Sequence, residues 1–201
     1  MPEPASDPTR EPASAPATVA VRRRIPVALL SLLLPALVGT ALWHTAWPGM
    51  VDTLGRGQLG NGEVWRVVTP LLVQTGPTAA VVVAFLLVAL VGWLAERWFG
   101  SARMAALYLG GGLVANVVGA WWDPHGAGIT VAGCGVLGGF AVWWLRMRRS
   151  GPVSAGAWVL LIGVFLAFSS DIHGVGALAG AVLGVVVLRD VPAVYRGRVR
   201  G

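Results

Sequence analysis

Residues 128–145 read GITVAGCGVLGGFAVWWL and contain no charged side chain. A helix that crosses a membrane needs roughly 20 apolar residues, because about 30 Å of hydrocarbon is crossed at about 1.5 Å per residue. This stretch fits that length, and its apolar residues do not alternate with the period of two that a strand would show. We therefore predict an all-α polytopic membrane protein with six transmembrane helices. The other five runs of this kind are 26–47, 78–95, 104–122, 153–170 and 174–188, the last of them short.

The composition of the whole chain indicates the same class. Its 201 residues are 56% hydrophobic and only 12% charged, with a mean hydropathy of +0.72. A soluble domain carries about 25% charged residues. This composition argues against a soluble globular protein. The chain has a single cysteine, Cys134, so no intrachain disulfide can form.

The positive charges indicate how the helices cross the membrane. All 15 basic residues are arginines, and the formal net charge is +6. Most of them lie in segments that share one side of the membrane, whereas the opposite segments hold only Arg56 and Arg66. This positive-inside pattern predicts a multi-pass plasma-membrane protein with cytoplasmic N and C termini, and we expect no nucleic-acid partner. The arginines that carry the pattern are Arg22, Arg23, Arg24, Arg97, Arg103, Arg146, Arg148, Arg149, Arg189, Arg196, Arg198 and Arg200.

Three parts are predicted along the chain. Residues 1–24 are expected to be a disordered cytoplasmic tail, because they are rich in Pro, Ala, Ser and Thr. Residues 25–190 form the six-span domain, and residues 191–201 form a basic cytoplasmic tail. The arginines before the first apolar run resemble a secretory signal. No small-x-small cleavage site follows that run, so we expect an uncleaved anchor.

Glycines mark the faces on which two of the helices should pack. At about 100° per residue, the glycines of the sixth run stay within about 60° of His173, and those of the fourth run surround Cys134. Small residues let helix backbones approach closely in lipid. We expect the two faces to meet and to bring Cys134 and His173 together near the outer ends of their helices. The glycines concerned are Gly135, Gly138, Gly176, Gly180 and Gly184.

A thiol beside an imidazole is a nucleophile–base pair suited to acyl transfer. We expect Cys134 in the first turn of its helix, where partial positive charge favours the thiolate and the backbone N–H groups of Gly133 and Cys134 could hold an oxyanion. The alternative is a small packing cysteine and a histidine that only hydrogen-bonds a neighbour. The three histidines and Cys134 lack metal-ligand spacing, so no metal and no cofactor is predicted.

The order of motifs along residues 26–190 resembles the rhomboid family of intramembrane serine proteases. The family's Gly-x-Ser-Gly motif has a counterpart in Gly133-Cys134-Gly135, preceded by Ala132. Its His-x-x-Gly-x-x-x-Gly motif corresponds to His173, Gly176 and Gly180. The other matching residues are Glu63-Val64-Trp65-Arg66, Thr69-Pro70, Glu96-Arg97, Gly100-Ser101, Arg103, Tyr108, Gly111 and Asn116.

This resemblance implies a rhomboid-like helical bundle with a water-filled cavity open to the outside. Family members cut transmembrane segments of other proteins with a Ser–His dyad and no metal. If the roles of the family's Ser and His are carried over to this chain, Cys134 is the nucleophile and His173 is the general base. Trp65 and Arg66 are expected to anchor the first outer loop at the membrane interface.

Two departures from the family pattern affect the chemistry. The nucleophile is a cysteine rather than a serine. The family's second span also carries a His and, four residues later, an Asn that hold the oxyanion. Two alanines, Ala80 and Ala84, or in the other register Ala79 and Val83, occupy those positions here. The candidate substitutes are Gln74, Thr75 and Thr78.

We expect Asp171 to cap the last span rather than to orient His173, because residues two apart on a helix point in different directions. Three functions remain open: a peptidase with a Cys–His dyad, a catalytically inactive rhomboid-like protein that binds transmembrane clients, and a small channel or transporter. The spans lack paired carboxylates, arginines and inverted repeats, which disfavours the third. The expected partners are transmembrane substrates or clients and the lipid bilayer, and we expect a monomer.

Overall fold

The computed structural model of the chain describes residues 25–57, 62–147 and 155–191. All regular structure in these segments is helical. The tails predicted for residues 1–24 and 191–201 lie outside them, apart from Val191. The helices are α1 (Val27–Thr45), α2 (Met50–Leu54), the 3-10 helices η2 (Val64–Val67) and η3 (Thr69–Leu72), α3 (Thr78–Phe99), α4 (Ser101–Trp122), α5 (Thr130–Met147), α6 (Ala155–Phe168) and α7 (Ile172–Val187).

Six of these helices coincide with the six predicted apolar runs. By length and composition, α1, α3, α4 and α5 can each cross a membrane. The apolar helices α6 and α7 are shorter, with 14 and 16 residues, or about 21 and 24 Å. The prediction of an all-α, polytopic membrane bundle is confirmed.

A glycine sets the boundary between α3 and α4. Gly100 has φ 85° and ψ 162°, a backbone conformation that residues with a Cβ rarely adopt. Because the chain turns at this residue, α4 begins at Ser101, three residues before the start of the predicted run.

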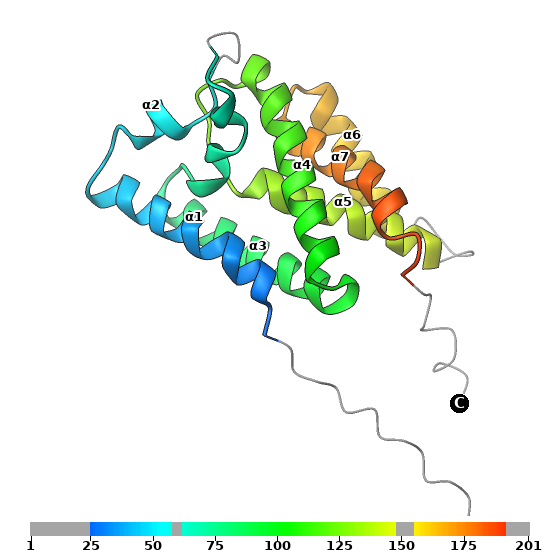
Figure 1. Cartoon of the computed structure of the whole chain (residues 1–201). Coiled ribbons are helices and arrows are strands. Elements are labelled where there is room, and N and C mark those ends of the chain that lie inside the picture. The colour runs from blue at the N-terminus through cyan, green and yellow to red at the C-terminus, as the bar shows by residue number, and fades with distance from the viewer. Residues whose placement is uncertain (1–24, 58–61, 148–154, 192–201) are drawn as a thin grey trace, which may run out of the picture.

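The helices α4, α5 and α7 form the centre of the bundle, and α1, α3 and α6 pack around them (Figure 1). The contact between α5 and α7 is made by backbone atoms. A Cβ added at Gly180 would overlap the carbonyl oxygen of Gly135, and one added at Gly111 of α4 would lie 2.5 Å from the Cα of Gly135. Three helices therefore meet at Gly135. The other glycines of the two predicted faces also lie against the backbone of the partner helix: Gly138, Gly176 and Gly184.

The carboxylate of Glu96 joins three elements at one end of the bundle. It accepts hydrogen bonds from the backbone N–H groups of Ala28 (3.1 Å) and Leu29 (2.9 Å) in the first turn of α1, and from the hydroxyl of Ser101 in α4. The first-turn N–H groups of a helix have no partner within it, so a carboxylate placed there stabilises α1 and fixes it to the turn between α3 and α4.

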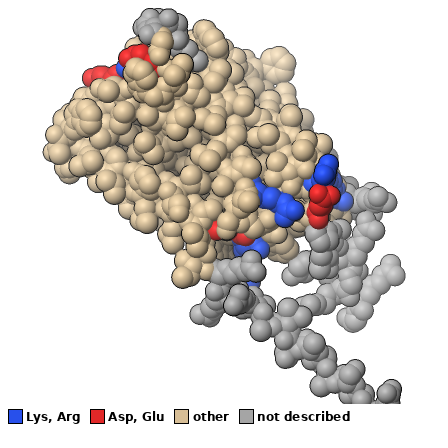
Figure 2. Space-filling view, viewed as in Figure 1, with Lys and Arg blue, Asp and Glu red and all other residues tan. Residues whose placement is uncertain are grey.

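Charged side chains gather at the two ends of the bundle, and the face between them is almost free of charge (Figure 2). We call the end formed around Arg97, Arg103, Arg146 and Arg189 the arginine end. There, Arg103 and Arg146 donate to the carbonyl oxygens of Val187 and Val185 in the last turn of α7. The opposite end, which we call the loop end, contains α2, η2, η3 and the loop of residues 123–129 (Figure 1).

The substitution Gly180→Leu tests the contact between α5 and α7. Because the new side chain would overlap the backbone of Gly135, we expect the free energy of unfolding to fall by about 1–3 kcal/mol or more. Each kcal/mol lost should lower the melting temperature by about 2–4 °C. The measurement is thermal unfolding of the purified protein in detergent. Val182→Leu is the matched control, because Val182 lies on the same helix and is 69% exposed. Equal melting temperatures for the two variants would contradict the contact.

Candidate active site

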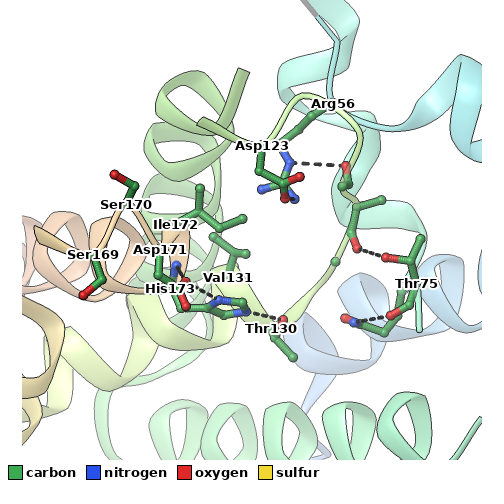
Figure 3. A pocket seen from close by; sticks show the side chains of 14 residues that line it. Arg56, Thr75, Asp123, Thr130, Val131, Ser169, Ser170, Asp171, Ile172 and His173 are labelled. Atoms are coloured by element: carbon green, nitrogen blue, oxygen red, sulfur yellow. Dashed lines mark hydrogen bonds and ion pairs between the residues drawn. The ribbon is translucent and has the colours of Figure 1, made fainter. Parts of the chain in front are cut away.

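A polar cavity of about 520 Å³ opens at the loop end of the bundle. The first turns of α5 and α7 form one side of it, and the loops that precede α3 and α5 form the other (Figure 3). Its polar lining residues are Arg56, Gln74, Thr75, Asp123, Thr130, Ser169, Ser170, Asp171 and His173. A cavity lined in this way can hold water and the polar backbone of a bound peptide.

His173 lies between a hydroxyl and a carboxylate in this cavity. Its Nε2 is 3.0 Å from the Oγ1 of Thr130, and its Nδ1 is 2.7 Å from the Oδ1 of Asp171 (Figure 3). An ionised carboxylate can only accept, so Nδ1 carries the proton and Nε2 is free to accept from the threonine hydroxyl. The order hydroxyl, imidazole, carboxylate is that of a nucleophile, its base and a group that orients the base.

Asp171 caps α7 and also contacts the ring of His173. Its backbone is extended, with φ −91° and ψ 122°, and its Oδ1 accepts from the backbone N–H of His173 at 2.8 Å. Burial raises the pKa of Asp171, but the hydrogen bonds from the backbone and side chain of His173 outweigh burial and lower it. The expectation that the two side chains point apart is wrong, because Asp171 lies before the helix and its side chain folds back over the first turn.

The structure does not bring Cys134 to His173. The helix α5 begins at Thr130, so Cys134 is in the second turn and not in the first as expected. Among the described residues, no hydrogen bond joins the half-buried thiol to the imidazole, and Cys134 does not line the cavity. The hydroxyl of Thr130, one turn earlier on the same helix, occupies the place that we predicted for the thiol.

The sequence does contain a signal for Thr130. Gly128-Ile129-Thr130 has the spacing of the first three positions of Gly-x-Ser-Gly, with threonine for serine, and Val131 replaces the last glycine. The sequence favoured Cys134 as the predicted nucleophile, because thiols are the stronger nucleophiles and because glycines flank it. The register of α5 on α7 decides which turn of α5 lies beside His173, and the apolar pattern does not define that register.

The backbone N–H groups of Gly133 and Cys134, which we predicted as oxyanion donors, are not the free N–H groups of α5. The N–H of Gly133 donates to the carbonyl of Ile129 at 3.0 Å, so the helix already uses it. The N–H groups of Val131 and Ala132 belong to the first turn of α5, and no hydrogen bond from them is found within the described segments. These two groups, rather than those of Gly133 and Cys134, are free to bind a developing negative charge.

The loop before α3 contributes two of the three candidate substitutes for the family's His and Asn. Gln74 and Thr75 line the cavity, whereas Thr78 does not. The Oε1 of Gln74 accepts from the N–H of Ile129 at 2.9 Å, and the hydroxyl of Thr75 donates to Ala127 at 2.8 Å (Figure 3). These bonds fasten the loop before α3 to the loop before α5.

A buried arginine lines the cavity. Arg56 is 5% exposed, and its Nη2 is 2.8 Å from the Oδ2 of Asp123. Its backbone N–H and its Nε both donate to the carbonyl of Gly126, at 3.0 and 3.2 Å. Burial lowers the pKa of Arg56, and the charge of Asp123 partly offsets this. The arginine therefore holds the segment after α2 against the loop between α4 and α5.

Arg66 organises the first loop from outside the cavity. It pairs with Glu63 at 2.7 Å and donates to the carbonyl oxygens of Asp52 (2.7 Å) and Gly55 (3.1 Å). Its neighbour Trp65 is 48% exposed. These contacts fit a role in anchoring the loop, and the position of Trp65 relative to the membrane surface stays a prediction. Within the described segments, no three His, Cys, Asp or Glu side chains come together as a metal site.

The substitution Asp171→Ala tests the cap on α7. Loss of a helix cap costs about 0.5–2 kcal/mol, so we expect a lower melting temperature than that of wild type in detergent at pH 7. Because the folded protein lowers the pKa of Asp171, the carboxylate contributes stability above its ordinary pKa of about 4 and loses it as the pH falls through the lower folded value. The difference should therefore shrink below about pH 4. Asp171→Asn keeps the oxygen that accepts from the backbone and should stay close to wild type. An equal difference between wild type and Asp171→Ala at pH 3 and pH 7 would contradict this account.

Comparison with known proteins identifies the family of the chain. Residues 61–190, well over half of the chain, match the family model for the Rhomboid domain. The Rhomboid protease GluP of Bacillus subtilis (strain 168) is 29% identical over 133 residues, which are 63% of this chain and 26% of that protein. The chain thus matches about a quarter of the length of this curated relative. No solved structure matches the chain. By the extent of the domain match, the chain is a member of the rhomboid family.

Proposed function

We propose that the protein is a rhomboid-type intramembrane endopeptidase in which Thr130 is the nucleophile and His173 is the general base. The observation that carries the proposal is the line of hydrogen bonds from Thr130 Oγ1 through His173 to Asp171, at 3.0 and 2.7 Å, beside a polar cavity. The relative GluP is described as a rhomboid protease, which supports the reaction class. The substrates would be transmembrane segments of other proteins.

Each proton transfer of the proposed reaction can be assigned to a residue of the site. The Oγ1 of Thr130 attacks the peptide carbonyl carbon as its proton passes to the Nε2 of His173, and the carbonyl oxygen becomes an oxyanion. The C–N bond then breaks, His173 protonates the leaving amine, and an ester to Thr130 remains. Water, deprotonated by His173, hydrolyses this ester and regenerates the hydroxyl. Asp171 keeps the Nδ1 of His173 protonated throughout, so that Nε2 faces the reacting atoms.

The nucleophile that we predicted from the sequence, Cys134, defines the alternative form of the same enzyme. It lies one turn deeper on α5 than Thr130. To act as its base, His173 would have to give up its hydrogen bond to Thr130. Threonine is a hindered secondary alcohol, whereas a thiol ionises more easily. The two forms differ in which side chain becomes acylated, and labelling can separate them.

A second function, the binding of transmembrane clients without cleavage, is favoured by α3. Neither Ala80 and Ala84 nor, in the other register, Ala79 and Val83 carry a polar group where the family has a His and an Asn. The loss of one oxyanion donor typically costs about 10²–10³ in rate. A protein with an intact cavity and no effective oxyanion site would bind a transmembrane segment and leave it uncut.

A fluorophosphonate probe distinguishes these possibilities. An activated hydroxyl displaces fluoride from phosphorus and forms a stable ester as its proton passes to the base. We expect wild type in detergent to gain this adduct at Thr130, located by peptide mass spectrometry. Thr130→Val and His173→Ala should lose at least 90% of the labelling, and Cys134→Ala should keep it. Labelling lost only in Cys134→Ala would support the thiol instead. Absence of labelling in wild type would count against the peptidase and favour client binding.

We also propose that the loop end faces the outside of the cell and the arginine end faces the cytoplasm, because arginines concentrate at the latter. In a Cys134→Ser background, His125→Cys should react from outside with a membrane-impermeant maleimide, and Arg97→Cys should react only after the membrane is permeabilised. Both native side chains are exposed in the structure. Labelling of Arg97→Cys in intact cells would invert the orientation.

A further inference from the structure

We propose that Gln74 is a catalytic residue that donates a hydrogen bond to the oxyanion. This inference rests on the proposed function, because it concerns the same reaction at Thr130. In either register, the helix α3 presents no polar side chain where the family places oxyanion donors, and the first turn of α5 offers only backbone N–H groups. The side-chain amide of Gln74 lies on the loop before α3 and lines the cavity.

The orientation of the Gln74 amide follows from its partners. Its Oε1 accepts from the backbone N–H of Ile129 at 2.9 Å, so the other terminal atom of the side chain is the NH₂ group. Nε2 donates one hydrogen to the carbonyl of Thr75 at 3.1 Å. An amide NH₂ carries two hydrogens, and no acceptor for the second is found within the described segments. The free N–H belongs to a side chain that is 8% exposed and borders the cavity.

The amide lies next to the turn that carries the proposed nucleophile. Its partner Ile129 immediately precedes Thr130. A Cβ added at Gly128 would lie 3.1 Å from Oε1 and 3.3 Å from Nε2, which is closer than ordinary contact. Gly128 therefore leaves the space that the amide occupies. The glycine of Gly-x-Thr thus has a physical role here, because it admits a polar side chain to the start of α5.

The loop that carries Gln74 is held in place from both sides. The backbone N–H of Gln74 donates to the hydroxyl of Thr40 in α1 at 2.9 Å. The next residue, Thr75, donates from its hydroxyl and from its backbone N–H to the carbonyl of Ala127, at 2.8 and 3.4 Å. A donor fixed before the reaction begins costs no reorganisation when the oxyanion forms, which is the condition for strong stabilisation of the transition state.

The test is the rate at which the fluorophosphonate labels Thr130 in the full-length protein. Gln74→Glu keeps an oxygen that accepts from Ile129 and removes the donor. Gln74→Met removes the donor without adding charge. We expect both to slow labelling by about 10²–10³ relative to wild type. Thr78→Val is the matched control: Thr78 is exposed, lies four residues away and does not line the cavity, so this variant should label at the wild-type rate.

The outcomes separate this inference from the proposed function. Wild-type labelling that depends on Thr130 but is equally fast in Gln74→Glu would overturn the role of Gln74 and leave the peptidase intact. Slow labelling of Gln74→Glu with wild-type speed in Gln74→Met would assign the effect to the added charge and also overturn it. If Gln74→Met does not fold, Gln74→Leu takes its place as the neutral variant that lacks the donor. Absence of labelling in wild type would overturn both proposals.

Discussion

The direct backbone contact between α5 and α7 determines where the polar groups of the cavity lie. Gly180 rests on the carbonyl of Gly135, and no side chain larger than hydrogen fits between them. In lipid, apolar side chains gain little by leaving their surroundings, so close packing of backbones is a main source of helix association. Because the two helices run in the same direction at this distance, their first turns come side by side at the loop end, and Thr130 faces His173.

The parts of the fold that were predicted from the sequence are those with a periodic signal. The apolar runs gave the helices, and the glycines of the fourth and sixth runs lie at the predicted contact. The motif around His173 also placed that residue at the cavity. We predicted Cys134 rather than Thr130 beside His173, because the glycines do not define the register of α5 on α7 to within one helical turn. This register depends on contacts between segments that are 43 or more residues apart, which no local pattern gives.

Arg56 and Asp123 were not predicted to line the cavity for a similar reason, whereas Gln74 was named as a candidate oxyanion donor. Arg56, Gln74 and Asp123 lie in loops that have no periodic pattern, and each finds its partner in another loop. From the sequence, Arg56 is only an exception to the positive-inside pattern. Its burial shows that an arginine at the loop end can serve structure rather than topology. Likewise, the contact of Asp171 with the imidazole depends on one extended residue before α7, which helical geometry alone does not reveal.

The separation of Thr130 and His173 along the chain affects when the site can exist during synthesis. The two residues are 43 positions apart, with the whole of α6 between them. A ribosome delivers helices to the membrane in order, so α5 enters the bilayer with its hydroxyl unpaired, and the imidazole follows two helices later. The base reaches the hydroxyl only when α7 has packed against α5. A chain that stalls before that point carries no assembled hydroxyl–imidazole pair.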